Sequence, residues 1–385
     1  MERLSRKSPA RFRPPLALTA LAGLIAGTMW ATGTPSALAS PLPHGGGCRT
    51  VEVPVTIPQV SRLGEISGRY CVPSRPNGTV LLLVGGGGEN ADYWSMQGLP
   101  RSYSLVDAAN RDGFATYAID RLGTGRSTIP AQSTQVTYAA MVSTEDQVAR
   151  ALHNGRKFGH GWRRVAGVGH SLGSGNLAGV AAQDPGEIDP VVLTGYGPQV
   201  SPQTLQLDQL YQVPANTIAA KWADLDSGYK AVIPADIALA GSSYAPDTTP
   251  AALAAAAENE GTLSATELST RPQGTAATAQ GSLITIPVLV ADGQYDEHYC
   301  LTNPVGQPAV VGPQCSTPTA FQAYEAALLP NACLSTAVIP GSGHAIQEEQ
   351  AAPAADALIL DWLKSTLTGT EPHCATSGPF PGRRR

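Results

Sequence analysis

Short, continuous hydrophobic runs alternate with longer amphipathic segments along most of this chain. The runs at 79–84 and 114–119 contain few polar residues, a pattern typical of strands that are buried on both faces of a sheet. The predicted strands are 50–57, 65–72, 79–84, 114–119, 163–168, 190–194, 286–291 and 335–339. The predicted helices are 103–111, 144–158, 174–183, 319–329 and 352–367. Strands that alternate with helices at this spacing predict an α/β protein with a mostly parallel, doubly wound sheet.

The alternation is interrupted between residues 196 and 281. This segment is rich in alanine and helical in pattern, and it lacks the buried apolar runs of core strands. Because Tyr211, Trp222, Tyr229 and Tyr244 provide aromatic surface to bury, we predict a helical cap here rather than a low-complexity spacer. The cap precedes the strand at 286–291. The predicted organisation is an α/β core formed by residues 40–195 and 282–370, the cap at 196–281, and a C-terminal tail at 371–385.

The first 39 residues have the features of a secretory signal peptide. A start with five basic residues is followed by the uncharged apolar run 16–30, and Ala37-Leu38-Ala39 supplies small residues before a predicted cleavage at Ser40. The apolar run is short and interrupted by glycine, which favours export over a membrane anchor. Removing five basic residues and one acidic residue from totals of 25 and 30 leaves a net charge of about −9. That charge argues against nucleic acid or an anionic membrane as partner.

All six cysteines lie in the predicted exported part. An even number in an oxidising compartment predicts three disulfides, and of the fifteen possible connectivities we favour one with a Cys48–Cys71 pair. The other four would then pair among themselves: Cys300, Cys315, Cys333 and Cys374. The absence of a Cys-x-x-Cys motif or a Cys/His cluster argues against a zinc site, and no metal or cofactor is expected.

The residues Gly169-His170-Ser171-Leu172-Gly173 lie between a predicted strand and a predicted helix. A serine at such a corner, with glycine two positions before and after it, has the pattern of a nucleophile elbow. The strained backbone of that turn pushes the hydroxyl outward, and side chains at the flanking positions would collide with neighbouring backbone. A glycine-rich turn with a capping serine is the structural alternative, but the strand and helix on either side favour Ser171 as a nucleophile.

A nucleophilic serine needs a base and an acid that orients the base. His344 follows the last predicted strand, where a loop could bring its imidazole over the sheet edge, and His298 is its rival. Asp292 ends the preceding strand and Asp296 lies four residues further on. A residue in the loop beyond a parallel strand can point into a site, so we favour Asp296.

A tetrahedral intermediate also needs two backbone amides to stabilise its oxyanion. We expect one from Leu172, directly after the nucleophile. The other should come from the glycine run after 79–84, and we choose Gly87, although Gly86 and Gly88 are not separable from it by sequence. A phosphate-binding role for these glycines is disfavoured, because neither a P-loop nor a dinucleotide fingerprint is present.

Together these motifs resemble the α/β-hydrolase superfamily, and in particular its secreted microbial serine hydrolases of the esterase and lipase type. The matching segments appear in family order: Gly85–Gly88, Asp120–Ser127, Gly169–Gly173, Gly293–Asp296 and Gly341–His344. The resemblance implies the α/β-hydrolase fold, a Ser171–His344–Asp296 triad and an acyl-enzyme mechanism. The chain departs from many members in having Val84-Gly85 where they carry a histidine before the oxyanion glycines.

The sequence therefore predicts a secreted serine hydrolase that cleaves small-molecule carboxylic esters. A secreted peptidase of the same fold is the main alternative, with Glu258, Glu260 or Glu267 as the anchor for a free amine. A lyase without an acyl-enzyme and a non-enzymatic binding protein remain further alternatives. An aspartate nucleophile is absent from the elbow, which disfavours dehalogenase and epoxide hydrolase chemistry.

Overall fold

The computed structural model of the protein describes residues 46–60, 62–202, 204–205, 211–233, 244–302 and 310–370. The predicted signal peptide at 1–39 and the predicted tail at 371–385 lie outside these residues, so both stay predictions. No helix within the described ranges is long and apolar enough to span a membrane.

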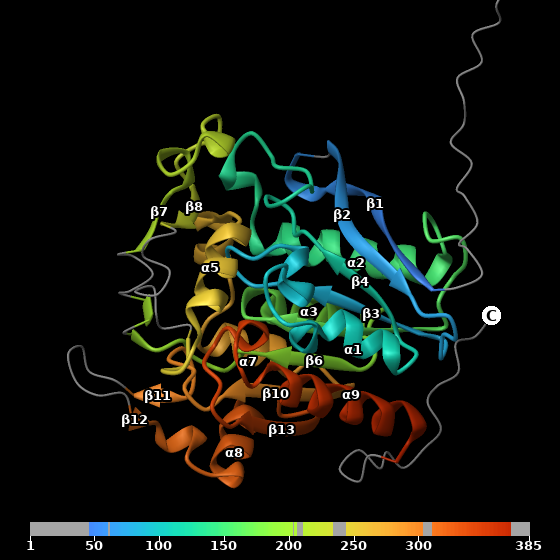
Figure 1. Ribbon diagram of the computed structural model, residues 1–385, viewed down its shortest axis with the longest axis vertical. Coiled ribbons are helices and arrows are strands. Elements are labelled where there is room, and N and C mark those ends of the chain that lie inside the picture. The colour runs from blue at the N-terminus through green and yellow to red at the C-terminus, as the bar shows by residue number, and fades with distance from the viewer. Residues whose placement is uncertain are drawn as a thin grey trace, which may run out of the picture. The chain divides into compact units, whose positions relative to one another are not determined.

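The described residues form one eight-stranded sheet, which crosses the centre of Figure 1. In spatial order its strands are β1 (Gly47–Ile57), β2 (Arg62–Val72), β4 (Ala115–Ile119), β3 (Thr79–Val84), β5 (Arg164–His170), β6 (Val191–Thr194), β10 (Pro287–Gly293) and β13 (Cys333–Ile339). The β1–β2 and β2–β4 pairs are antiparallel, and the pairs from β4 to β13 are parallel. The strand order therefore confirms the predicted mostly parallel sheet.

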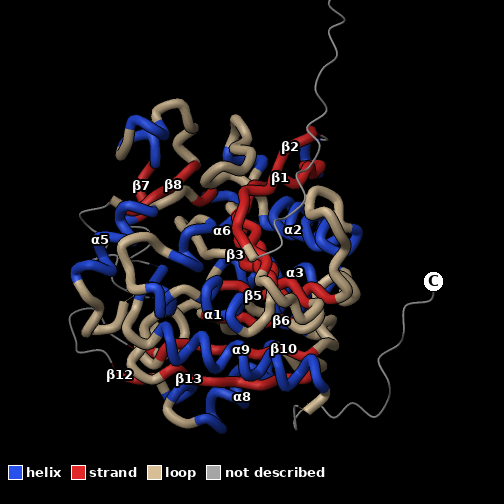
Figure 2. Tube along the Cα trace, turned by 45° about the vertical axis from the view of Figure 1, so that its right-hand side comes forward, coloured by secondary structure: helices blue, strands red, loops and turns tan. Residues whose placement is uncertain are grey.

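Helices cover both faces of this sheet, as the two views in Figures 1 and 2 show. Helices α1 (Leu105–Arg111) and α9 (Ala352–Thr368) pack on one face, and α2 (Tyr138–Asn154), α3 (Leu172–Gln183) and α8 (Pro318–Leu328) pack on the other. Strand β3 serves both cores, because alternate side chains of a strand point to opposite faces. Every residue of β3 is buried, which explains its unbroken apolar sequence.

The predicted helix at 144–158 begins and ends earlier in the structure. Helix α2 starts at Tyr138 because the Thr137 hydroxyl accepts a hydrogen bond from the Ala140 amide at 3.1 Å, which satisfies a free donor of the first turn. It ends at Gly155, whose φ of 74° is the left-handed conformation of a helix C-cap. The sequence estimate missed the threonine cap and extended the helix past the glycine.

The cap segment is a mixture of helices and short strands, so the prediction of a helical cap needs correction. It contains α5 (Pro250–Asn259), α6 (Ala265–Thr270) and α7 (Thr275–Gly281) together with a three-stranded antiparallel sheet of β7 (Gln212–Pro214), β8 (Tyr229–Val232) and β9 (Leu263–Ser264). These strands have two to four residues, too few to produce a readable alternation. Strands β7 and β8 lie beside α5 at the left of Figure 1.

Two of the disulfides lie wholly within the described residues. Cys48–Cys71 joins β1 to β2, as predicted, and Cys300–Cys315 closes the loop that carries β11 (Leu301–Thr302) and β12 (Val310–Val311). Cys333 is also disulfide-bonded, and Cys374 lies outside the described residues. Disulfides of this kind are typical of oxidising compartments.

Candidate active site

Ser171 occupies the sharp corner between β5 and α3. Its φ of 51° and ψ of −116° lie in a region that costs a non-glycine residue about 1–3 kcal/mol. The flanking glycines are required by close packing, since a Cβ at Gly169 would lie 2.6 Å from the Ser174 Cα and one at Gly173 would lie 2.2 Å from the Val84 carbonyl oxygen. The predicted strand–serine–helix geometry is therefore present, and it directs Ser171 toward the cap side of the sheet.

His344 and Asp296 meet in the loops after β13 and β10. The His344 Nδ1 donates a hydrogen bond to the Asp296 Oδ2 at 2.7 Å, and both residues are buried. Burial alone would raise the pKa of the Asp296 carboxyl, but the charge and hydrogen bond of His344 outweigh it and hold that pKa below its ordinary value. The carboxylate therefore stays ionised and orients the imidazole.

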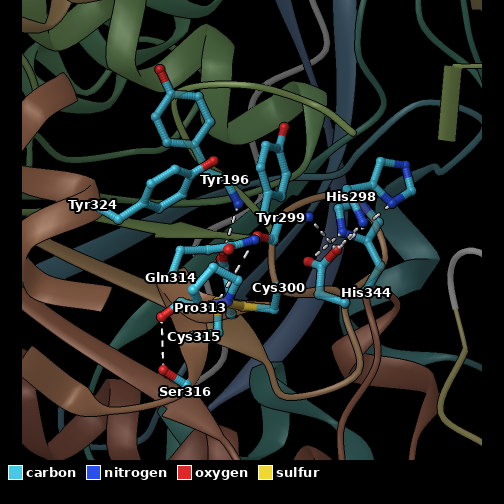
Figure 3. The surroundings of a disulfide bond; sticks show 12 residues. Tyr196, His298, Tyr299, Cys300, Pro313, Gln314, Cys315, Ser316, Tyr324 and His344 are labelled. Atoms are coloured by element: carbon cyan, nitrogen blue, oxygen red, sulfur yellow. Dashed lines mark hydrogen bonds and ion pairs between the residues drawn. A yellow bond between two sulfur atoms is a disulfide. The ribbon is translucent and has the colours of Figure 1, made fainter. Parts of the chain in front are cut away.

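The two rivals named from sequence have other partners. Asp292 lies within β10, and its Oδ1 accepts a hydrogen bond from the Tyr196 amide at 3.0 Å, the backbone role expected at a strand end. The His298 imidazole stacks on that of His344, with ring centroids 3.8 Å apart and planes within 14° (Figure 3). Burial, followed by the charge of His344, lowers the pKa of His298 well below its ordinary value. His298 is thus a neutral ring that packs against His344.

A third imidazole, that of His170, packs beneath the elbow. It stacks on Tyr93 with centroids 4.8 Å apart and lies 4.8 Å from the His344 ring. Its Nδ1 is 3.2 Å from the Thr194 hydroxyl, and its Nε2 is 3.2 Å from a Glu89 carboxylate oxygen. These contacts fix the ring beneath the elbow. The contact with Glu89 had no signal in the sequence.

Several backbone groups of the glycine loop after β3 have hydrogen-bond partners. The Gly86 amide donates to the Glu89 Oε2 at 2.5 Å, and the Gly86 carbonyl accepts from the Arg121 Nη2 at 2.6 Å. The Gly88 carbonyl accepts from the Gly261 amide at 2.6 Å. Gly87 lines the same cavity as Ser171, and a Cβ built on it would lie 3.0 Å from the Leu172 side chain. Because the Gly86 amide is already bonded to Glu89, Gly87 and Gly88, which both line this cavity, remain the candidate oxyanion donors.

The Asp120–Ser127 segment holds this loop from behind. The Asp120 Oδ1 accepts from the Ala91 amide at 2.8 Å, and its Oδ2 accepts from the Arg126 amide at 2.7 Å. Arg121 is buried and forms an ion pair with Glu267 of cap helix α6 in addition to its bond with Gly86. Glu267 is consequently unavailable as an anchor for a free amine, which corrects the sequence hypothesis. Nothing in the sequence indicated this, because Arg121 lies 146 residues away.

One group of side chains in the described structure has metal-ligand character. Potential ligand atoms of Asp296, His298 and His344 lie within 4.8 Å of one another. A metal ion binds an imidazole nitrogen in the plane of its ring, and the two stacked rings have nearly parallel planes that do not direct both lone pairs at one point. The Asp296–His344 hydrogen bond would also have to break. The arrangement therefore fits a hydrogen-bonded base better than a metal site.

A cavity of about 560 Å³ opens above the elbow. Ser171, Leu172, Gly87 and His344 line it from the core, and residues of the cap close it from the opposite side. Three acidic residues, Glu89, Glu260 and Glu348, line it as well. Glu258, the remaining anchor candidate, is exposed and does not line the cavity. The described structure thus brings all five sequence-predicted site residues into one region of the molecule.

A family profile described as the alpha/beta hydrolase family matches residues 80–357. The chain belongs to this family. A search among curated protein sequences finds no significant match.

The chain is similar to several solved hydrolase structures. An esterase from Thermogutta terrifontis matches with a TM-score of 0.55 and 18% identity, over 82% of this chain and 98% of that one. A carboxylesterase from Bacillus subtilis matches with a TM-score of 0.51 and 14% identity, over 84% and 92%. A putative aryl esterase from Burkholderia cenocepacia matches with a TM-score of 0.51 and 17% identity, over 82% and 99%. At these identities the likeness supports the fold.

Proposed function

We propose that the protein is a secreted serine hydrolase that cleaves carboxylic esters of small molecules through an acyl-enzyme. The observation that carries this proposal is the backbone of Ser171, strained beside a cavity that also receives the oriented imidazole of His344. A strained serine at a helix N-terminus with a carboxylate-held histidine in the same cavity is the arrangement that acyl transfer needs. The disulfides support export.

In the proposed reaction the Ser171 hydroxyl attacks the ester carbonyl while His344 removes its proton. Asp296 holds the Nδ1 of His344, which directs the basic Nε2 toward the hydroxyl and stabilises the imidazolium that forms. The amides of Leu172 and Gly87 donate to the oxyanion of the tetrahedral intermediate. The imidazolium then protonates the leaving alcohol, and water releases the acid from Ser171 by the same steps in reverse order.

Substitution of the nucleophile tests the proposal directly. Ser171→Ala should abolish cleavage of 4-nitrophenyl butyrate and labelling by a fluorophosphonate probe. Ser269→Ala is the control, because Ser269 lines the same cavity but its hydroxyl donates to the Thr266 carbonyl within α6. The Ser269→Ala protein should still be labelled. Labelling that survives in Ser171→Ala would refute the assignment.

A peptidase is the second candidate, because one of its predicted anchors lines the cavity. The Glu260 Oε1 accepts from the Val232 amide at 2.9 Å, and burial, with the nearby charge of Glu89, raises the pKa of Glu260 to about 8. A carboxyl that is protonated at neutral pH is a poor partner for an ammonium group, which favours the esterase. Faster turnover of an aminoacyl 4-nitroanilide than of 4-nitrophenyl butyrate would reverse this preference.

A further inference from the structure

A second cavity, of about 480 Å³, adjoins the one above Ser171. The two share the lining residues Val200, Leu205, Arg271, Gln273 and Tyr299, so they form two lobes of one binding space. Arg271 is the only charged residue among the described residues that line the second lobe. Its guanidinium therefore sets the electrostatic character of the junction.

Arg271 has no partner within the described structure that would neutralise it. Its side chain forms no ion pair and no hydrogen bond with a described residue. The acidic residues Glu89, Glu260 and Glu348 line the first lobe and are absent from the second. A guanidinium that lines a cavity without an acidic partner among the described residues can bind an anion there.

The position of Arg271 is fixed by the helix that precedes it. Helix α6 is anchored to the core by the buried Glu267–Arg121 ion pair, and the Thr270 hydroxyl at its C-terminus accepts from the Tyr138 amide at 2.9 Å. Arg271 follows directly as the C-cap residue, with an extended backbone. The backbone that carries Arg271 is thus held against the core, which lowers the entropy cost of ordering this part of the site.

Two tyrosines, Tyr196 and Tyr299, line the same lobe. Neither phenol oxygen forms a hydrogen bond with a described residue. Their rings extend to the same side of the Cys300–Cys315 disulfide in Figure 3. Tyr299 and Arg271 both line the two lobes. Burial raises the pKa of the Tyr299 phenol, and the charge of Arg271 opposes that rise. Two neutral phenols supply O–H donors in the lobe that Arg271 lines.

We propose that Arg271, with the hydroxyls of Tyr196 and Tyr299, binds a carboxylate of the substrate, so that the preferred esters are anionic. This inference rests on the proposed ester hydrolysis at Ser171. A charge-assisted hydrogen bond to a carboxylate in a partly enclosed lobe corresponds to a preference of about 10- to 100-fold over a neutral isostere.

The test uses two matched pairs of esters, one for each side of the scissile bond. On the acyl side, the mono-4-nitrophenyl ester of adipic acid is compared with that of adipamic acid, in which an amide replaces the carboxylate. On the alcohol side, 4-acetoxybenzoate is compared with 4-acetoxybenzamide. For at least one pair, the wild-type ratio of kcat/KM for the anionic ester to that for the neutral ester should exceed about 10. Ratios of one or less for both pairs would overturn the proposal.

Arg271→Gln should bring that ratio close to one, and Arg271→Lys should restore it in part. Lys230→Gln is the matched control, since Lys230 lines the first lobe only and its loss changes the net charge equally. The ratio should stay at the wild-type value in Lys230→Gln. If both glutamine variants lower the ratio alike, the effect is a general charge effect and the proposal is wrong.

A binding measurement separates this proposal from the proposed function. Titration of the Ser171→Ala protein with adipamate, which has one carboxylate, and with neutral adipamide needs no turnover. Adipamate should bind at least about tenfold more tightly, and Arg271→Gln in the same background should remove the difference. Equal binding of the two compounds would refute the carboxylate subsite even if ester hydrolysis is established. Selective binding without hydrolysis of any ester would refute the proposed function alone.

Discussion

The role of the acid can be tested by replacing Asp296 with asparagine. The Asp296 Oδ1 accepts hydrogen bonds from the His298 amide at 2.7 Å and from the Tyr299 amide at 3.3 Å. The asparagine carbonyl oxygen must take that position, because an NH₂ group cannot accept. The NH₂ group is then left facing His344, where it donates to Nδ1 and moves the imidazole proton to Nε2, the atom that has to act as base.

We expect the wrong tautomer to lower kcat for 4-nitrophenyl butyrate by about 10⁴-fold, equivalent to about 5.4 kcal/mol of transition-state stabilisation. Steady-state kinetics at pH 7.5 measures the loss, and thermal unfolding establishes that the variant is folded. The fall should be in kcat rather than in KM, because substrate binding does not use this carboxylate.

Asp292→Asn is the matched control. Burial, followed by the charge of Asp296, raises the pKa of Asp292 well above its ordinary value, which favours its neutral, protonated form. Asparagine has the shape of this neutral form and keeps the acceptor for the Tyr196 amide. We expect kcat within about tenfold of wild type, since no reacting group is altered. A dead Asp292→Asn beside a nearly normal Asp296→Asn would refute the reasoning and exchange the two roles.

Three further predictions concern packing, protonation and cross-linking. In Gly86→Ala the new Cβ would lie 2.9 Å from the Ser171 Cβ, so kcat should fall at least about tenfold. Gly47 has open space around it, so Gly47→Ala should keep the wild-type kcat. Equal kcat in both variants would contradict the packing argument. Burial raises the pKa of Glu145 from its ordinary value of about 4.5 to about 8. Between these two values the folded state holds a proton that the unfolded state has released. The free energy of unfolding should therefore fall as pH rises from 5 to 8. Urea unfolding at both pH values should show a smaller fall for Glu145→Gln, and an unchanged fall would count against a buried neutral carboxyl. Replacing both cysteines of Cys300–Cys315 by serine should cost about 3 kcal/mol of stability. It should also lower kcat, because this disulfide begins next to Tyr299. The same change at Cys48–Cys71 should leave kcat unchanged, and equal losses of kcat in the two variants would contradict a local effect.

Much of the core could be predicted from sequence because its strands are buried on both faces. The continuous apolar run of β3 and the glycine-bounded corner at Ser171 are local patterns with few alternative structures. The order of Ser171, Asp296 and His344 along the chain then assigned each residue to a loop at the same end of a parallel sheet.

The cap could not be predicted in the same way, because its structure depends on distant partners. Strand β9 has two residues and exists through its pairing with β8. Glu267 was a candidate anchor for a free amine in the sequence, but Arg121 is its partner in the folded chain. A charge pair between segments so far apart leaves no periodicity to detect, and the same holds for the lack of an acidic partner of Arg271 among the described residues.

The side chain of Arg121 links the position of the cap to that of the glycine loop. Its guanidinium donates one hydrogen bond to the Gly86 carbonyl of the glycine loop and another to the Glu267 carboxylate of the cap. A tilt of the cap that breaks the Arg121–Glu267 ion pair would leave a buried charge without its partner, unless the glycine loop moves together with the cap. Movement of the cap is therefore coupled to movement of the glycine loop, and lifting the cap would displace the loop that carries the proposed oxyanion donor.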